Sequence, residues 1–283
     1  MRTQVRESVE KDKTKELLSL PNSCQGEIDL KYDHPALRRL LAQGDRLLEQ
    51  PGVKLIFSGR NRIGVITFTR ADGQTVELVI KEFRIVGIDR FKTIFRASKA
   101  KRAWDGARHL IAAQIPTPPP VAYLEVKKGF GVEKAWFITE RVKEAEEIRE
   151  LLRLKRGEEL KSLLKDLAAF LRGLHRQRIH HRDLSDGNIL VEEKRGVRAF
   201  YLLDTNRLRK KRKLSSLAAV KSLIRVGVPP SYQRYFLECY FHQSPPPYLW
   251  WCWYKIAKGT FNFYLRFKKF IGLRKVAQRL RIQ

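Results

Sequence analysis

The chain has 283 residues, too many for one small domain, so one large domain or two lobes is expected. Apolar residues make up 43% of it, an ordinary share that allows a sizeable core. Its 58 Lys and Arg against 30 Asp and Glu leave a net charge of +28, which favours an anionic partner such as nucleic acid, an anionic membrane or a phosphorylated substrate. Residues 205–283 hold 18 basic residues and one acid, so they carry about +17 of this charge.

The features that direct a chain to a compartment point to the cytoplasm. The N-terminal stretch MRTQVRESVEKDKTKE lacks the apolar region of a secretory signal. No apolar run approaches the roughly 18 residues that a membrane span needs. Cys24, Cys239 and Cys252 show neither metal-ligand nor disulfide spacing, which favours a reducing compartment. We therefore expect a cytoplasmic protein, free or attached to the cytosolic face of a membrane.

The first part of the chain predicts a sheet after a charged extension. We expect residues 1–45 to be irregular, apart from a short helical pattern near Leu37, Leu40 and Leu41. Residues 46–140 then predict a first lobe, which begins with strands at about 53–57, 62–69 and 75–83. The second turn of this meander is ADG, in which Gly73 is free to take a positive φ.

One helix and two more strands complete the predicted first lobe. Residues 91–113 predict a single basic helix, which the prolines of IPTPPP stop. Its apolar side is expected to hold Phe95, Trp104, Leu110 and Ile111. The segments VAYLEV and KAWFITE predict two strands around the turn KKGFG.

From residue 141 to 283 the pattern is mainly helical. Six leucines recur at spacings that place them on one helix face: Leu160, Leu163, Leu164, Leu167, Leu171 and Leu174. Two short apolar strands follow, ILV at 189–191 and FYLL at 200–203, joined by a polar turn. The rest is basic and predicted to be helical.

The segment between that helix and the first short strand reads HHRDLSDGNIL. It fits the catalytic-loop pattern H-R-D-L-x-x-x-N at every fixed position, from His181 to Asn188. Asn188 enters one short strand and Asp204 leaves the other, so an antiparallel pair would bring their side-chain oxygens together. A Mg²⁺ ion between phosphates requires such oxygens. Asp183 would lie nearby, placed to accept a proton from a substrate hydroxyl.

Lys81 lies inside a strand of β-branched residues, 102 positions before Asp183. An exposed strand lysine that points away from the core is the alternative. Alternation instead places Val79, Lys81 and Phe83 on one inner face, with Ile80 on the other. A lysine between apolar neighbours needs an anionic partner, which the phosphates of ATP would supply.

Lys81, the 181–188 motif and Asp204, in this order, resemble the protein-kinase-like superfamily. The closer resemblance is to the lipopolysaccharide core kinases, which phosphorylate Kdo or heptose of the inner core. The segments RASKAKRAWDGARHL, IPTPPPVAYLE, WFITE, HHRDLSDGNILVEE and YLLDTNRLR carry it, within roughly residues 50–215. The resemblance implies a bilobal α+β fold with an antiparallel-sheet N-lobe and a mainly helical C-lobe.

The resemblance also implies roles for the residues of the cleft. Lys81 would hold the α- and β-phosphates of ATP. Asp183 would be the catalytic base, or orient the acceptor hydroxyl. Asn188 and Asp204 would hold Mg²⁺.

Further roles follow for residues around the nucleotide. Thr139 and Glu140 would lie at the hinge, where backbone groups read adenine. Gly59 would belong to the loop over ATP, although SGRNRIG is a poor copy of a glycine-rich loop. His181 and Arg182 would brace the catalytic loop.

The chain departs from protein kinases in several places. The helix glutamate that pairs the strand lysine is not evident: Ala103 stands near its expected position, and Asp105 lies on another face. The metal motif reads Asp-Thr-Asn, Ser185 replaces a phosphate-contacting lysine, and no A-P-E follows Asp204. These differences argue against a protein substrate more than against phosphoryl transfer.

Two basic segments could either bind an anionic partner or have no binding role. The run after Asp204 is either a solvated face or a contact for the phosphates of an acidic acceptor or membrane: Arg207, Arg209, Lys210, Lys211, Arg212 and Lys213. The segment 241–283 mixes aromatic and basic residues. It either packs in a core or binds an anionic membrane surface; nucleic acid could use the same chemistry but is not the expected partner.

We therefore expect an ATP- and Mg²⁺-dependent kinase that phosphorylates Kdo–lipid A or another inner-core acceptor, bound peripherally to the cytoplasmic side of the bacterial inner membrane. A kinase of a protein, or of a small molecule such as an aminoglycoside, is one alternative, although a basic site should repel a cationic aminoglycoside. A catalytically dead kinase scaffold that binds membrane or nucleic acid is the other. Nucleotide-dependent stabilisation and the choice of acceptor discriminate among them.

Overall fold

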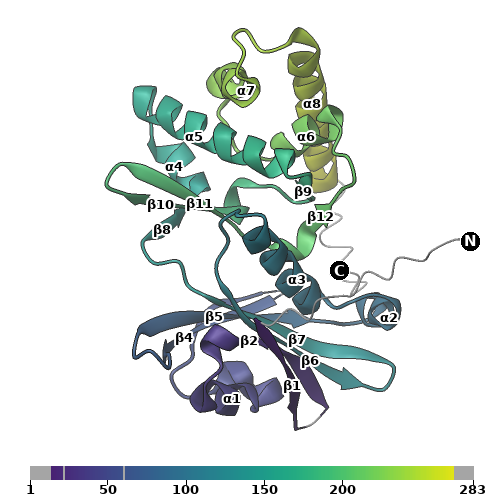
Figure 1. Cartoon of the computed structure of the whole chain (residues 1–283). Coiled ribbons are helices and arrows are strands. Elements are labelled where there is room, and N and C mark those ends of the chain that lie inside the picture. Colours follow the sequence, from purple (N-terminus) through teal and green to yellow (C-terminus); the bar gives the residue numbers. More distant parts are fainter. Residues whose placement is uncertain (1–13, 22, 60, 271–283) are drawn as a thin grey trace, which may run out of the picture.

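The computed structural model describes residues 14–21, 23–59 and 61–270, which form two lobes with the helix α3 (Lys99–Ala112) between them (Figure 1). The first lobe is an antiparallel sheet in the order β1-β2-β6-β7-β5-β4-β3. Its strands in chain order are β1 (Lys15–Leu20), β2 (Cys24–Asp29), β3 (Lys54–Ser58), β4 (Asn61–Thr69), β5 (Thr75–Arg84), β6 (Pro120–Lys128) and β7 (Gly131–Glu140).

The strands predicted between residues 53 and 140 are confirmed. Strands β3, β4 and β5 form the expected meander, and Gly73 has a φ of +80° in the β4–β5 turn. Strands β6 and β7 pair around the turn at Gly129, which also has a positive φ. Glycine takes this conformation without the steric cost that a Cβ would add.

The irregular conformation expected before residue 45 is wrong for residues 15–29. This segment forms β1 and β2, and β2 extends the sheet by pairing with β6. The predicted short helix exists as α1 (Pro35–Leu41), with Leu37 and Leu41 buried, and η2 (Gly44–Glu49) follows it. These helices pack on the face of the sheet away from α3.

The single helix predicted at 91–113 is two helices. Helix α2 (Ile88–Phe95) ends where Arg96 turns extended, and Ser98 then caps α3 by accepting a hydrogen bond from the Lys101 N–H at 3.1 Å. A serine at this position satisfies a free N–H of the first turn. Of the residues assigned to one apolar side, Trp104 is buried on α3 and Phe95 is exposed on α2.

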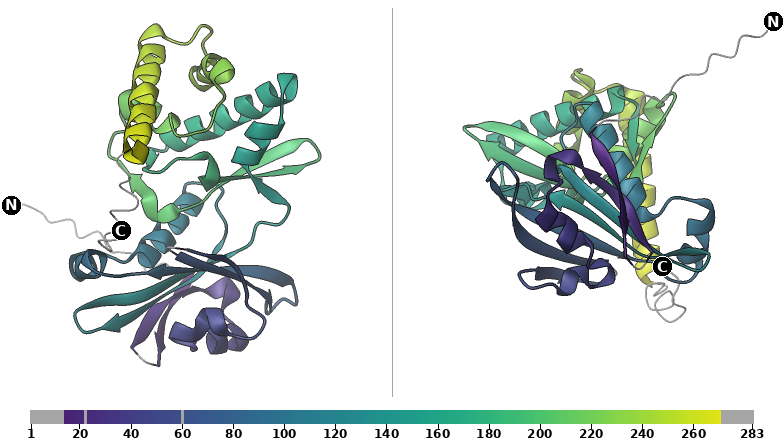
Figure 2. Two further views of the ribbon diagram at one scale, coloured as in Figure 1. Left: turned by 180° about the vertical axis from the view of Figure 1, so that it is seen from behind. Right: turned by 60° about the horizontal axis from the view of Figure 1, so that its bottom comes forward.

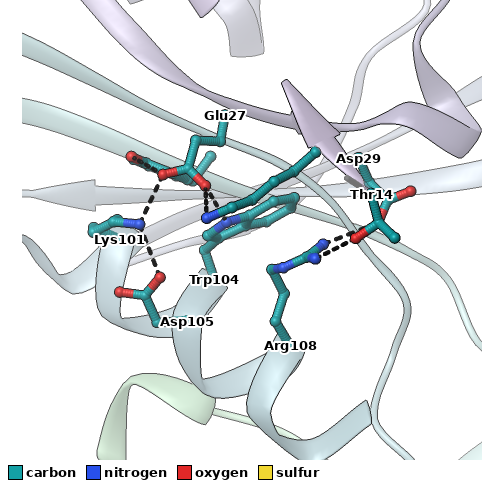
Figure 3. A network of polar contacts seen from close by, with 9 residues as sticks. Thr14, Glu27, Asp29, Lys101, Trp104, Asp105 and Arg108 are labelled. Atoms are coloured by element: carbon teal, nitrogen blue, oxygen red, sulfur yellow. Dashed lines mark hydrogen bonds and ion pairs between the residues drawn. The ribbon is translucent and has the colours of Figure 1, made fainter. Parts of the chain in front are cut away.

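A buried carboxylate joins α3 to β2 (Figure 3). Glu27 accepts hydrogen bonds from Lys101 Nζ at 2.8 Å and from Trp104 Nε1 at 3.1 Å, and pairs with Lys15 at 2.7 Å. One turn further on, Arg108 pairs with Asp29 at 3.2 Å. The two N-terminal strands thus fix the position of α3 on the sheet.

The second lobe is mainly helical. Helix α5 (Gly157–Arg176) buries all six of the predicted leucines. Around it lie α4 (Ile148–Leu154), α6 (Ser216–Leu223), η5 (Pro230–Tyr232), α7 (Gln233–Phe241) and α8 (Tyr248–Phe270). Its short strands are β8 (Ala145–Glu147), β9 (Ile179–His181), β10 (Ile189–Lys194), β11 (Val197–Leu202) and β12 (Leu208–Lys210), with the single turns η3 (Asp186–Asn188) and η4 (Thr205–Arg207).

Helix α8 packs against α6 along the outer part of this lobe (Figure 2). Tyr254 is buried, and four more aromatic residues pack against the core: Trp250, Trp251, Trp253 and Phe261. About half of the aromatic residues in this segment therefore pack in the core, the alternative to membrane binding. Among the described residues, no helix combines the length and apolar character that crossing a membrane requires. Residues 271–283 of the predicted basic tail lie outside the described part.

Candidate active site

A cavity of about 320 Å³ lies between the lobes. Val79, Lys81 and Phe83 line it from β5, while Ile80 belongs to the core on the opposite face of the sheet. The alternation predicted around Lys81 is therefore confirmed. Asn188 and Asp204 line the same cavity from the second lobe.

The β10–β11 hairpin brings Asn188 and Asp204 together, as predicted. Ile189 pairs with Leu202, and the Leu203 N–H donates to the Asn188 carbonyl at 2.9 Å. The amide Nδ2 of Asn188 donates to the Asp183 carbonyl at 2.8 Å, which leaves its amide oxygen for a cation. Asp204 begins the next turn with a φ of +53°, a left-handed conformation that aspartate tolerates better than most residues.

Lys81 and Asp204 form an ion pair across the cavity. Burial alone would raise the pKa of Asp204, but the charge of Lys81 and the hydrogen bond from it outweigh burial and lower the pKa. The carboxylate is thus ionised, as a cation ligand must be. The amine of Lys81 and the side-chain oxygens of Asn188 and Asp204 therefore line one cavity, although Lys81 and Asp204 are 123 residues apart in the chain.

Asp183 lies beside Asn188 rather than in the wall of the cavity. Its carboxylate pairs with Arg225 at 2.7 Å, and Arg225 also lies over the ring of Phe261, 5.3 Å from its centroid. The pair fixes the direction of the carboxylate. Sequence reasoning missed Arg225, since nothing in its surroundings distinguishes it from other basic residues.

His181 braces the loop through both ring nitrogens. Nδ1 accepts from the Asp183 N–H at 3.2 Å, and Nε2 contacts the carbonyl oxygens of Leu203 and Asp204 at 3.1 and 3.2 Å. Burial lowers the pKa of His181 more than the carbonyl contacts raise it, so the ring is neutral with its proton on Nε2. The Arg182 N–H donates to the Arg207 carbonyl at 3.1 Å.

Only one of the other predicted nucleotide-binding residues of the first lobe lines the cavity. Thr139 lines the cavity. The Glu140 N–H donates to the Pro119 carbonyl at 2.8 Å, and its carboxylate accepts from Tyr32 Oη at 2.5 Å, so neither group is free for adenine. Gly59 lies at the β3–β4 turn and does not line the cavity. The roles assigned to Thr139, Glu140 and Gly59 stay predictions.

Helix α3 meets the metal motif without a glutamate. Ala103 lines the cavity, its carbonyl accepts from Thr205 Oγ1 at 2.7 Å, and Asp105 pairs with Lys101 instead. A Cβ on Gly106 would overlap the Thr205 carbonyl oxygen, so glycine permits this close contact. The turn after Asp204 is thereby attached directly to α3.

Among the residues that line the cavity but were not predicted from the sequence are an acid and an amide. Glu147 reaches it from β8, and Asn206 reaches it from η4. The Asp-Thr-Asn motif, of which Asn206 is the third residue, could have identified Asn206 from the sequence. No motif marks Glu147.

The basic run after Asp204 divides into two parts. Arg207 and Arg209 line a second cavity, on the other side of Asn206. The rest is exposed: Lys210, Lys211, Arg212 and Lys213. Within the described residues, Arg207 and Arg209 have no ion-pair partner.

The cavity suits ATP and Mg²⁺. Its volume lies within the range of about 300–1,000 Å³ that is usual for small-molecule sites. Ile63, Val79 and Leu202 give it apolar surface, and Lys81 and the two oxygen ligands line the same cavity. Amide and carboxylate oxygens are hard donors of the kind that Mg²⁺ prefers.

Comparison with known protein families matches the segment that contains the residues of the cavity. The model of the family described as "Lipopolysaccharide kinase (Kdo/WaaP) family" matches residues 81–227, just over half of the chain. The match starts at Lys81 and includes Asp183, Asn188 and Asp204. The chain belongs to this family. Among proteins of curated function, none matches the sequence.

The fold of this family member is also found in a solved structure, "WaaP in complex with acyl carrier protein". The two share 18% sequence identity with a TM-score of 0.52, over 74% of this chain and 88% of that chain. At this identity the likeness shows the fold alone. It confirms the expected kinase-like arrangement of an antiparallel-sheet N-terminal region and a helical C-terminal region.

Proposed function

We propose that this lipopolysaccharide kinase family member transfers the γ-phosphate of ATP to a sugar hydroxyl, of Kdo or heptose, in the inner core. The observation that carries the proposal is the meeting of Lys81, Asn188 and Asp204 at one cavity, inside the segment that the family model matches. The reaction forms a bond between the acceptor oxygen and the γ-phosphorus and breaks the bond to ADP.

Each residue has a role that follows from its position. Lys81 binds the phosphates of ATP and leaves Asp204 free to bind Mg²⁺ together with Asn188. The metal ion supplies neutralisation of charge on the transferring group. Asp183, directed by Arg225, orients the acceptor hydroxyl and takes its proton. Most of the acceleration then comes from positioning and electrostatics.

An acidic acceptor is favoured by the surroundings of the site. Arg207 and Arg209 follow the metal motif directly, and they lie in a region with few acids. A cationic aminoglycoside would be repelled there. No A-P-E motif follows Asp204, which argues against docking of a peptide.

The test is transfer to a panel of acceptors. Purified chain is incubated with Mg²⁺-ATP and, separately, Kdo–lipid A, a heptosylated inner-core glycolipid, a basic peptide and an aminoglycoside. Mass spectrometry should show one added phosphate on a glycolipid and none on the others. Phosphate on the peptide or the aminoglycoside alone would refute the acceptor class, although not the kinase activity.

We also propose that the chain acts at the cytoplasmic side of the inner membrane as a peripheral protein, since a lipid-linked acceptor resides in the membrane. The last turns of α8 support this location. Phe263, Phe267 and Phe270 are exposed there among Arg266, Lys268 and Lys269. Aromatic rings at the level of the headgroups and cations at lipid phosphates favour binding to an anionic bilayer.

A further inference from the structure

A second cavity, of about 250 Å³, lies beside the proposed active site and is lined by cations from four segments. It opens where the α2–α3 linker meets the catalytic loop and the strand after Asp204. Five arginines line it: Arg96, Arg102, Arg182, Arg207 and Arg209. Lys92 and Lys99 complete the set, and we call this place the basic cavity.

The basic cavity has too few carboxylates for its cations. Asp89 is the one acid among the residues that line it, and it pairs with Lys92 at 3.3 Å and Lys99 at 2.8 Å. In the part of the chain that the structure describes, none of the five arginines has an ion-pair partner. Among the described residues, Arg102 donates only to backbone carbonyls, those of Ala97, Ser98 and Asn206.

The arginines repel one another. Burial lowers the pKa of Arg96, and the charges of Arg209, Arg182 and Arg207 lower it further. Burial and the charges of Arg96, Arg209 and Arg207 lower the pKa of Arg102 to about 10. Like charges gathered in one place destabilise the folded chain unless a counter-charge is bound.

Asn206 adds a polar atom without a partner. It is 7% exposed, it lines both cavities, and its amide oxygen accepts no hydrogen bond from any described residue. A buried acceptor normally finds a donor. A ligand that carries both anionic oxygens and a hydroxyl would satisfy the arginines and Asn206 together.

We propose that the basic cavity binds a phosphate-class anion, such as inorganic phosphate or a phosphomonoester group, at a site distinct from the nucleotide. Planar guanidinium groups match the oxygens of phosphate in paired hydrogen bonds. The volume is below that usual for drug-sized ligands, so it suits a head group rather than a second nucleotide.

The bound anion joins α3 to the catalytic residues. Arg102 precedes Ala103 on α3, Arg182 precedes Asp183, and Arg207 lies three residues after Asp204. An anion shared by these arginines holds the two lobes in the arrangement that forms the active site. Binding of inorganic phosphate at this site does not depend on which acceptor the active site takes, whereas the source of the anion in the cell rests on the proposed function.

Thermal unfolding of the full chain tests the site without any activity assay. Sodium phosphate should raise the melting temperature of the parent well beyond sodium chloride of the same ionic strength. In Arg96→Ala/Arg209→Ala this difference should disappear. Without phosphate the double variant should melt at or above the temperature of the parent, because two repelling charges are gone, and this outcome also shows that it folds.

The matched control is Arg39→Ala/Arg153→Ala, which removes two exposed arginines on α1 and α4 that line neither cavity. It should keep the full response to phosphate. The proposal is overturned if phosphate and chloride act alike on the parent, or if the Arg96→Ala/Arg209→Ala variant responds as the parent does.

Kinetics with a phosphorylated glycolipid acceptor in vesicles distinguish the two sources of the anion. If the occupant is the phosphate of the glycolipid, inorganic phosphate competes, and the double variant raises KM with kcat nearly unchanged. If the occupant is soluble phosphate, added phosphate raises kcat of the parent and not of the variant. An unchanged KM and kcat in the variant would contradict the link to catalysis.

Discussion

Cations lie beside the carboxylates of the candidate active site. Lys81 pairs with Asp204 and Arg225 with Asp183, so both acids of the candidate active site have a fixed direction before any ligand binds. Burial opposes ionisation of Asp204, and Lys81 offsets it. The same arrangement occurs outside the cavity, at Glu27.

Glu27 gives a stability prediction with a defined pH window. Burial would raise its pKa, but the hydrogen bonds and charges of Lys101 and Lys15 lower it from 4.5 to about 2. A carboxylate with a lowered pKa stabilises the fold above its unfolded value, and this contribution is lost as the pH falls from 4.5 towards 2. Glu27→Gln should therefore lower the free energy of unfolding at pH 7 by roughly 2–3 kcal/mol.

Urea unfolding at several pH values measures this effect. The difference between parent and Glu27→Gln should shrink below pH 4.5 and nearly vanish near pH 2. Glu158→Gln is the control, because Glu158 is 86% exposed and solvent screens its pair with Lys161. A difference at Glu27 that does not change with pH would contradict the assigned ion pairs.

At the scale of elements, the attachment of α3 replaces the missing lysine–glutamate pair. Thr205 donates to Ala103, and Gly106 allows the turn η4 to touch the helix backbone. Glu27 and Asp29 hold the other side of α3 (Figure 3). The helix is thus positioned from both sides by contacts that do not involve Lys81.

Two helix glycines should respond oppositely to alanine. Gly106→Ala forces a methyl group against the Thr205 carbonyl and should destabilise the fold by about 1–3 kcal/mol, with reduced turnover because Asp204 precedes Thr205. Gly173→Ala, in α5, meets open space and should stabilise by about 0.5–1 kcal/mol. Denaturation midpoints measure both. A stabilising Gly106→Ala would show that α3 does not lie so close to η4.

The elements that sequence patterns predicted well are those with simple periodicity. Leucines on one face of α5 and alternation around Lys81 follow directly from burial on one side. Strand β2 escaped prediction because it buries Glu27, which breaks the apolar alternation, and β1 is an edge strand that is mostly exposed. The break between α2 and α3 depends on a cap at Ser98, a local signal inside a continuous basic pattern.

In the candidate site, too, the residues within a local motif could be predicted and those brought in by tertiary structure could not. The H-R-D-L-x-x-x-N motif and the hairpin after it were sufficient to place Asn188 beside Asp204. Arg225 and Glu147 come from segments without a motif, so only tertiary structure brings them there. The basic cavity likewise gathers arginines from two regions that lie at least 80 residues apart in the chain, a set that charge counts alone cannot assemble.

At the scale of the whole molecule, the excess of positive charge and the exposed end of α8 predict binding to anionic vesicles. Phe267→Ser/Phe270→Ser should weaken binding to vesicles that contain phosphatidylglycerol, and higher salt should weaken binding of both proteins. Co-sedimentation measures this. The control Phe130→Ser/Leu154→Ser removes two exposed apolar residues in other places and should bind as the parent does. Unchanged binding of the α8 variant would assign the membrane contact elsewhere.

Separating nucleotide binding from turnover in Asp183→Ala tests whether Asp183 acts in phosphoryl transfer at a nucleotide site built by other residues. We predict that Mg²⁺-ATP stabilises this variant against heat as it does the parent, while kcat for the glycolipid acceptor falls by about 10²–10⁴-fold. Asp166→Asn, which changes a half-buried carboxylate on α5 that pairs with Arg198 and lines neither cavity, should leave both quantities unchanged. Full turnover by Asp183→Ala would show that Asp183 is not the catalytic base, and no stabilisation of the parent by Mg²⁺-ATP would show that the cavity is not a nucleotide site.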